Sequence, residues 1–250
     1  MPPRRPLFKE KETVRFRNLL FLLLMVPVLN SCVSQTNKKS FIPDPKNLND
    51  IIICYGDSIT LGVGENNWEG EDEAKSYPAF LGKKLSIPVI NAGVAGDTTT
   101  SALYRLYHDV LSLYPRIVII NLGANDFLSG FDIWLTEHNF HIMLSNLAHS
   151  NRQIYITKFY TDDILRQKMD SWNFPRLKRE QVINSYNEMY KSLVDIYDVE
   201  LIDDVWRNVW DRYMSDDIHP NLRGYEAMAG NYLEALRPSL EMYGFIRKWL

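Results

Sequence analysis

Residues 51–58 read Ile-Ile-Ile-Cys-Tyr-Gly-Asp-Ser, an apolar run that ends abruptly in a glycine and two polar residues. Three consecutive isoleucines predict a β-strand that is buried on both faces, because a half-exposed strand alternates apolar and polar residues. The change to Gly56-Asp57-Ser58 predicts a tight turn directly after the strand. This stretch therefore predicts a parallel sheet in which a strand ends in polar side chains.

The rest of the chain repeats the pattern of an apolar run followed by a helical segment. Further strands are predicted at residues 88–92, 116–122, 153–157 and 199–202. Helices are predicted at residues 98–114, 133–149, 180–197 and 221–236. Strands that alternate with helices predict an α/β fold, a three-layer α/β/α sandwich around a parallel sheet of about five strands. We expect one domain over residues 51–250.

The first 32 residues differ in composition from the α/β domain predicted over residues 51–250. A basic segment precedes 11 uncharged residues at 19–29, which is too short for a membrane-spanning helix of about 20 residues but suits a secretory signal peptide. Leu29-Asn30-Ser31-Cys32 resembles the lipobox of bacterial lipoproteins, which implies a lipid on Cys32 and an exported protein anchored to the outer membrane or cell envelope. The alternative is an ordinary signal peptide in which Cys32 is incidental. Residues 33–50 are expected to form a flexible tether.

The net charge of −3 is unevenly distributed over the 250 residues. Residues 1–32 carry six basic and two acidic side chains, whereas the remainder carries 22 basic and 29 acidic ones. An acidic body argues against a nucleic-acid partner, because such binding depends on neutralising phosphates. Two cysteines in the whole chain are too few for a disulfide framework.

Short polar loops follow three of the predicted strands, and a fourth lies near the C-terminus. They are Gly56-Asp57-Ser58, Gly93-Val94-Ala95-Gly96-Asp97-Thr98, Gly123-Ala124-Asn125-Asp126 and Asp216-Asp217-Ile218-His219. In an open parallel sheet, ligands bind at the carboxyl ends of the strands. The joint order of these loops is therefore a stronger indication of a site than any one of them.

The four loops supply the groups that acyl transfer requires. Ser58 begins a helix after a strand, which suits an exposed nucleophile. His219 is the best candidate for its base, because the other four histidines lie within helical patterns. Asp216, three residues before His219, can orient the imidazole better than Asp217 can. The backbone N–H groups of Ser58 and Gly96 and the side-chain amide of Asn125 can stabilise an oxyanion.

These loops resemble the four sequence blocks of the SGNH (GDSL) hydrolase superfamily. The stretches Val89–Thr99 and Ser185–Glu188 are similar to its thioesterase I/arylesterase/lysophospholipase branch. The resemblance implies a flavodoxin-like sandwich, with Ser58 as nucleophile, Gly96 and Asn125 in the oxyanion hole, and His219 and Asp216 as base and orienting acid. It implies no metal or organic cofactor. Ala124 departs from the glycine that is usual at this position in the branch.

Two classes of function remain open at this point. The first is a serine hydrolase of small-molecule esters: acyl or aryl esters, lysophospholipids, thioesters or O-acetylated envelope sugars. The second is a non-catalytic surface lipoprotein, which would have no need for Ser58, Asn125 and His219 together.

Residues 160–178 make a long strand–helix connection. We expect there either a mobile lid that sets substrate choice or a short surface helix with its apolar face on the core.

Overall fold

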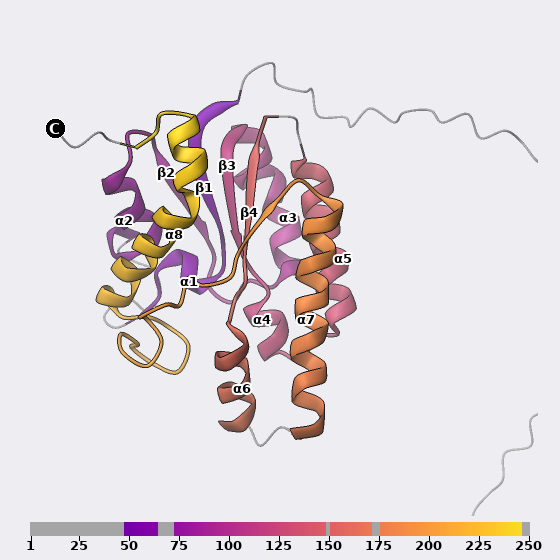
Figure 1. Ribbon diagram of the computed structural model, residues 1–250. Coiled ribbons are helices and arrows are strands. Elements are labelled where there is room, and N and C mark those ends of the chain that lie inside the picture. The colour runs from indigo at the N-terminus through magenta and orange to yellow at the C-terminus, as the bar shows by residue number, and fades with distance from the viewer. Residues whose placement is uncertain (1–47, 65–72, 149–150, 172–175, 247–250) are drawn as a thin grey trace, which may run out of the picture. The chain divides into compact units, whose positions relative to one another are not determined.

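The computed structural model describes residues 48–64, 73–148, 151–171 and 176–246 (Figure 1). The predicted signal peptide, Cys32 and the tether up to residue 47 lie outside the described residues. Within the described part of the chain, no helix is both long enough and apolar enough to cross a membrane.

The described body is built on one sheet of five parallel strands in the order β2-β1-β3-β4-β5. This strand order is that of flavodoxin-like folds, so the predicted architecture is confirmed. The strands are β1 (Asn49–Gly56), β2 (Val89–Gly93), β3 (Pro115–Asn121), β4 (Gln153–Thr157) and β5 (Glu200–Ile202).

The triple isoleucine run lies in the middle of this sheet. Ile53 of β1 is in register with Ile90 of β2 on one side and with Val118 of β3 on the other. Residues 52–55 and 117–120 are fully buried. Because the two central strands are covered on both faces, neither alternates apolar and polar residues.

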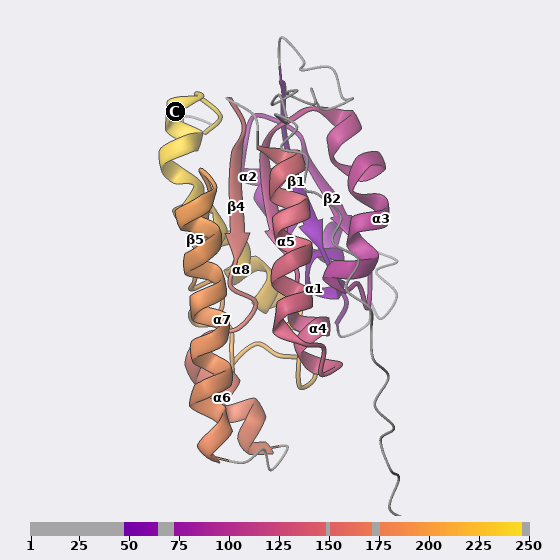
Figure 2. The ribbon, with the colours of Figure 1, turned by 90° about the vertical axis from the view of Figure 1, so that its right-hand side faces the viewer.

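Helices cover both faces of the sheet in the described chain (Figures 1 and 2). On one face α3 packs against α5 and α5 against α7, while α2 and α8 pack together on the other. The helices are α1 (Ser58–Leu61), α2 (Tyr77–Lys84), α3 (Thr99–Asp109), α4 (Ala124–Leu128), α5 (Ile133–Leu147), α6 (Asp162–Ser171), α7 (Arg176–Ile196) and α8 (Leu222–Met242), with 3₁₀ turns η1 (Glu73–Lys75) and η2 (Leu111–Leu113).

The C-terminal ends of two helices differ most from those expected. The segment predicted at 98–114 ends as an α-helix at Asp109, and a separate 3₁₀ turn follows it. The last helix continues six residues past the predicted end at residue 236, because its buried face continues through Ser239 and Leu240. The Ser239 hydroxyl lies 2.7 Å from the Tyr155 hydroxyl, which attaches the added turns to the sheet.

The segment after β4 contains a helix rather than an extended loop. Helix α6 buries Ile164, Leu165 and Met169, as expected for a surface helix whose apolar face lies on the core. Lys158 at the end of β4 donates to Asp162 of α6 (2.5 Å) and to Asn187 of α7 (2.7 Å), which joins the helix to its neighbours. These contacts favour the surface-helix alternative for α6, and residues 172–175 lie outside the described range.

Candidate active site

The sheet topology brings the predicted loops to one edge. Strands β1, β2 and β3 are parallel neighbours, so the residues that follow them emerge at the same edge of the sheet. Ser58 follows β1, Gly96 follows β2 and Asn125 follows β3. Residues 216–219 reach them from the connection between β5 and α8.

A tight turn between β1 and α1 presents Ser58. A Cβ atom on Gly56 would lie 2.1 Å from the Thr60 hydroxyl oxygen and 2.6 Å from the Asn121 carbonyl oxygen, so only glycine fits there. Asp57 then caps α1, since its carboxylate accepts the Ile59 N–H over 3.0 Å. Ser58 is consequently the first helical residue and stays half-buried rather than packed into the core.

The three predicted catalytic side chains form one hydrogen-bonded chain. The Nε2 atom of His219 lies 3.0 Å from the Oγ atom of Ser58. The Nδ1 atom of the same ring lies 2.7 Å from Oδ2 of Asp216. These distances lie within hydrogen-bond reach for a nucleophile, a base and an orienting acid.

Asp216 holds the loop as well as the imidazole. Its Oδ1 atom accepts the backbone N–H groups of Ile218 (2.8 Å) and His219 (2.7 Å). Burial acts to raise the pKa of Asp216, but the hydrogen bonds from the His219 ring and these two amides outweigh it and lower the pKa. Asp216 is therefore held as a carboxylate beside the ring, whereas Asp217 is exposed and has no such bond to His219.

The groups predicted to stabilise an oxyanion lie around the loop after β2. The Asn125 amide donates to the main-chain carbonyl of Asp97 over 2.9 Å, which places it beside the residue that follows Gly96. Gly96 has a φ of 77°, a left-handed conformation that favours glycine. Among the described residues, the backbone N–H groups of Ser58 and Gly96 have no protein acceptor. Each of these three groups therefore keeps an N–H that can donate a hydrogen bond to a ligand oxygen.

The departure at Ala124 leaves the arrangement of this loop intact. Ala124 is the first residue of α4 and is buried. Gly123, just before it, takes the left-handed conformation with a φ of 105°. The added methyl group therefore lies in the helix and not at the position that requires glycine.

Arg105 of α3 is an important residue of this edge that the sequence analysis did not single out. Its guanidinium donates to the Asp97 carboxylate (2.6 Å) and to the carbonyl oxygens of Gly56 and Ala92 (2.8 Å each). It also pairs with Asp109 at 2.9 Å. The i,i+4 spacing of these opposite charges on a predicted helix is the sequence feature that could have identified Arg105. Arg105 therefore ties together the ends of β1 and β2 and the loop of the predicted oxyanion hole.

Two further carboxylates at this edge are structural. Asp126 is fully buried and accepts the backbone N–H of Thr99 (2.8 Å) and the hydroxyls of Thr99 (2.5 Å) and Thr136 (3.3 Å). Asp57 is also buried, and desolvation followed by repulsion from Asp97 and Asp126 raises its pKa to about 7. Through these bonds Asp126 and Asp57 order the loops at this edge of the sheet.

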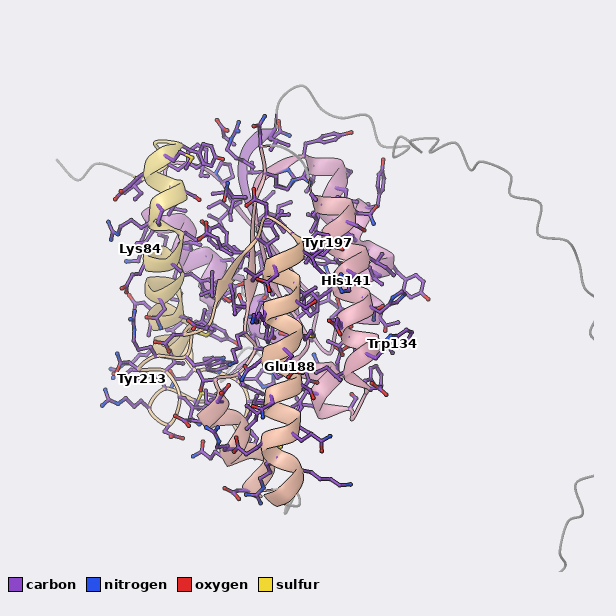
Figure 3. All side chains as sticks on the ribbon, turned by 45° about the vertical axis from the view of Figure 1, so that its right-hand side comes forward. Lys84, Trp134, His141, Glu188, Tyr197 and Tyr213 are labelled. Carbon is purple, nitrogen blue, oxygen red and sulfur yellow. The ribbon has the colours of Figure 1, made fainter. Side chains whose placement is uncertain are left out.

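The described histidines outside the catalytic loop also have structural surroundings. Figure 3 shows His141 of α5 beside Tyr197, and Nδ1 of His141 lies 3.2 Å from the tyrosine hydroxyl. His138 stacks on Trp134 with ring centroids 5.2 Å apart. His108 is exposed and lies 2.7 Å from Asp109. His149 lies outside the described residues, so His219 is the described histidine that contacts Ser58.

The fold and this edge define a class of protein: a serine hydrolase built on a flavodoxin-like sheet. The model of the GDSL-like lipase/acylhydrolase family matches residues 54–227, and the chain belongs to this family. It is an enzyme that hydrolyses ester bonds.

Individual relatives agree with this assignment. The chain is 27% identical over 194 residues to the thioesterase 1/protease 1/lysophospholipase L1 of Escherichia coli strain K12, covering 76% of this chain and 84% of the relative. It is 25% identical over 220 residues to an acetylxylan esterase of Geobacillus stearothermophilus, with 74% and 93% covered. The crystal structure of TesA shares the fold, with a TM-score of 0.61, 22% identity, and 76% and 99% covered.

Proposed function

We propose that the chain cleaves carboxylic esters through a covalent acyl-enzyme on Ser58. The observation that carries this proposal is the continuous chain of hydrogen bonds from Ser58 through His219 to Asp216. A non-catalytic binding protein would not require a hydroxyl, an imidazole and a carboxylate in this order. The free donors of Ser58, Gly96 and Asn125 add the second requirement, a site for the developing negative charge.

The geometry supports a two-step reaction. His219 Nε2 takes the proton of Ser58 Oγ as the oxygen attacks the ester carbonyl carbon, and the carbonyl oxygen becomes an anion held by the three donors. The bond to the leaving oxygen then breaks, and the proton on Nε2 passes to that oxygen to release the alcohol. Water attacks the acyl-serine in the same way, which releases the carboxylic acid and restores Ser58. Asp216 stabilises the imidazolium in both steps.

An apolar pocket lined by residues of α4 and α7 is a candidate acyl-chain subsite. A cavity of about 420 Å³ lies between the α4–α5 connection and α7. Its apolar lining includes Phe127, Phe131, Ile133, Val182 and Tyr186. This volume is in the range of small-molecule sites. Phe127 of its lining belongs to the same helix, α4, as Asn125, and we propose that the hydrocarbon part of a substrate lies in this pocket.

The substrates that fit this arrangement are acyl or aryl esters and lysophospholipids. The name of the Escherichia coli relative, which includes thioesterase and lysophospholipase, supports this choice. The alternative is an O-acetyl esterase of envelope carbohydrate, which the acetylxylan esterase relative supports.

We further propose that the protein is exported and anchored through a lipid on Cys32. The basic segment, the apolar run and the lipobox-like residues 29–32 support this proposal.

A panel of esters with graded acyl length tests the catalytic proposal. We expect hydrolysis with a burst of the first product and stoichiometric inactivation by a phosphonate ester, with the added mass on the peptide that contains Ser58. Labelling of another residue, or no hydrolysis of any ester by the folded protein, would contradict the proposal.

The Cys32→Ser variant tests the lipid anchor. It should move the protein from the membrane fraction to the soluble fraction, and continued membrane association would contradict lipidation of Cys32.

A further inference from the structure

The catalytic loop, residues 215–219, is closed at its base and bonded inside its tip. At the base, the carbonyl oxygen of His219 accepts the backbone N–H of Ser215 (2.8 Å) and the Ser215 hydroxyl (3.0 Å). At the tip, the Asp216 carboxylate accepts the backbone N–H of Ile218 over 2.8 Å. The place of this carboxylate beside the imidazole thus depends on the peptide group that joins residues 217 and 218.

That peptide group is also bonded at its other end, to helix α6. Its N–H, from Ile218, donates to Asp216, whereas its carbonyl oxygen, from Asp217, accepts a hydrogen bond from the ammonium of Lys168. Lys168 precedes Asp217 by 49 residues and belongs to the helix that follows the carboxyl end of β4 (Figure 1). Lys168 therefore attaches a distant helix to the tip of the catalytic loop.

The surroundings of Lys168 fix the position of its ammonium. Lys168 is buried, and the ammonium lies 5.1 Å from the centroid of the Trp210 ring, which is within cation–π range. The Trp210 indole N–H in turn donates to the Gln167 side-chain oxygen over 2.5 Å. Burial lowers the pKa of Lys168, while the charges of Asp217 and Asp216 act against this shift and favour the ammonium. Packing and charge thus hold a cation at this point.

A cation at the carbonyl end of a peptide group strengthens the hydrogen bond made by its N–H end. Hydrogen bonds in a chain polarise one another, by roughly 10–30% per bond. Here the chain runs from Lys168 through the peptide group of residues 217 and 218 to Asp216. It continues to the His219 ring, whose Nδ1 lies 2.7 Å from Oδ2 of Asp216. Without the ammonium, the peptide group would be freer to rotate and would be a weaker donor to the carboxylate.

We propose that Lys168 is a positioning residue for ester hydrolysis, which holds the Asp216 carboxylate in line with His219 through the peptide group of residues 217 and 218. This inference rests on the proposed function, in which His219 is the base. Lys168 touches no reacting atom, so its effect passes through Asp216. Support from behind a catalytic group preserves the geometry that the transition state requires. The loss of Lys168 should therefore change kcat more than KM.

Lys168→Met tests this role, because methionine keeps an aliphatic stem beside Trp210 and removes the ammonium. On a p-nitrophenyl ester, kcat should fall about 5-fold, the factor that corresponds to one hydrogen bond, with KM nearly unchanged. The same fall should appear in Asn125→Ala, since Asn125 is bonded to the Asp97 carbonyl in a different loop. It should be much smaller in Asp216→Ala, which lacks the carboxylate that Lys168 supports.

Arg166→Met is the matched control on the same helix. Arg166 donates to Glu180 over 2.7 Å and so attaches α6 to α7 rather than to the catalytic loop. Its removal should leave kcat unchanged, and circular dichroism and the melting temperature check that both variants fold.

Chemical rescue of Lys168→Cys separates the charge from the volume of the side chain. Residue 168 lines a cavity of about 390 Å³, which gives a small reagent access. Alkylation with 2-bromoethylamine rebuilds an ammonium at lysine length and should restore kcat, whereas 1-iodopropane adds an uncharged chain of the same length and should not. Wild type treated in the same way controls for the native cysteines, of which Cys54 is fully buried.

Three results would each overturn the positioning role of Lys168. They are an unchanged kcat in folded Lys168→Met, an equal fall in the Asp216→Ala background, and equal rescue by the charged and uncharged chains. Failure of the proposed function is a separate result, because Asp216→Ala would then itself leave kcat unchanged.

Discussion

The side-chain amide of Asn125 donates one of its two N–H bonds to the main-chain carbonyl of Asp97, over 2.9 Å. This hydrogen bond fixes the amide in one orientation and leaves the second N–H for a ligand oxygen. Donors that are already oriented need no rearrangement when charge develops, and this is the main source of oxyanion stabilisation. The bond therefore joins the end of β3 to the loop after β2 in a form suited to catalysis.

Asn125→Ala should lower kcat by about 10²–10³, the usual effect of losing one oxyanion donor. KM should change much less, because the amide binds the tetrahedral intermediate better than the ground-state carbonyl. Steady-state kinetics on one p-nitrophenyl ester measure both constants. Asn146→Ala, at an exposed position of α5, is the control. A change in KM alone would reject the oxyanion role.

Arg105→Met should lower kcat because the Asp97 loop loses the guanidinium that holds it. Arg105 touches no reacting group in this account and acts through the oxyanion loop. Its effect on kcat should therefore be about 10-fold in the wild-type background and much smaller in Asn125→Ala, as expected for coupled residues.

The control for Arg105 is Arg116→Met at the opposite edge of the sheet, where Arg116 binds Asp50 at 2.6 Å and the Leu48 carbonyl at 3.2 Å. This variant should change thermal stability without changing kcat. An effect of Arg105→Met that is equally large in both backgrounds would show that it does not act through the oxyanion loop.

Asp216→Asn should lower kcat by about 10³–10⁴, because an amide beside Nδ1 favours the wrong imidazole tautomer. Asp217→Asn should lower kcat far less, since Asp217 contacts Lys168 through its main-chain carbonyl, which the substitution keeps. Both variants keep side-chain size, and circular dichroism checks that they fold. The reverse ranking of the two kcat values would reject Asp216 as the orienting acid.

Stability should depend on pH through Asp57. Its folded-state pKa of about 7 lies above the ordinary value, so the folded state binds more protons than the unfolded state between these values. Proton binding by Asp57 therefore stabilises the folded state. This stabilisation is fully present below about pH 4 and is lost as the pH rises through 7.

Asp57→Asn keeps a residue that can cap α1 and removes this titration. Urea unfolding at pH 5 and pH 8 should show a smaller loss of stability in the variant than in the wild type. Comparison with the wild type cancels the contributions of the other carboxylates. Identical losses in the two proteins would show that Asp57 does not titrate in this range.

The sheet and the catalytic loops could be predicted because both depend on short stretches of sequence. Ile51–Tyr55 is apolar without alternation, and Ser58 follows it within three residues. The position of His219 could be predicted because Asp216 lies three residues before it. Local patterns of this kind need no knowledge of distant contacts.

The role of Arg105 and the contact of α6 with the loop at 210–217 could not be predicted in the same way. Arg105 binds carbonyl oxygens 49 and 13 residues away, and carbonyl oxygens carry no sequence signal. Helix α6 meets the loop at 210–217 where the Lys168 ammonium donates to the main-chain carbonyl of Asp217. From sequence, the apolar residues of α6 fit either a lid or a surface helix, because their burial depends on the distant core against which they pack.

The most direct test of the central claim is hydrolysis of a p-nitrophenyl ester by purified Ser58→Ala. Ser58 is half-buried and its hydroxyl lies outside the core, so the variant should fold with a stability within about 1 kcal/mol of the wild type. We predict that it loses the acyl-enzyme burst and essentially all turnover while its circular dichroism spectrum and melting temperature stay unchanged. Turnover comparable to the wild type in the folded Ser58→Ala protein would contradict the account.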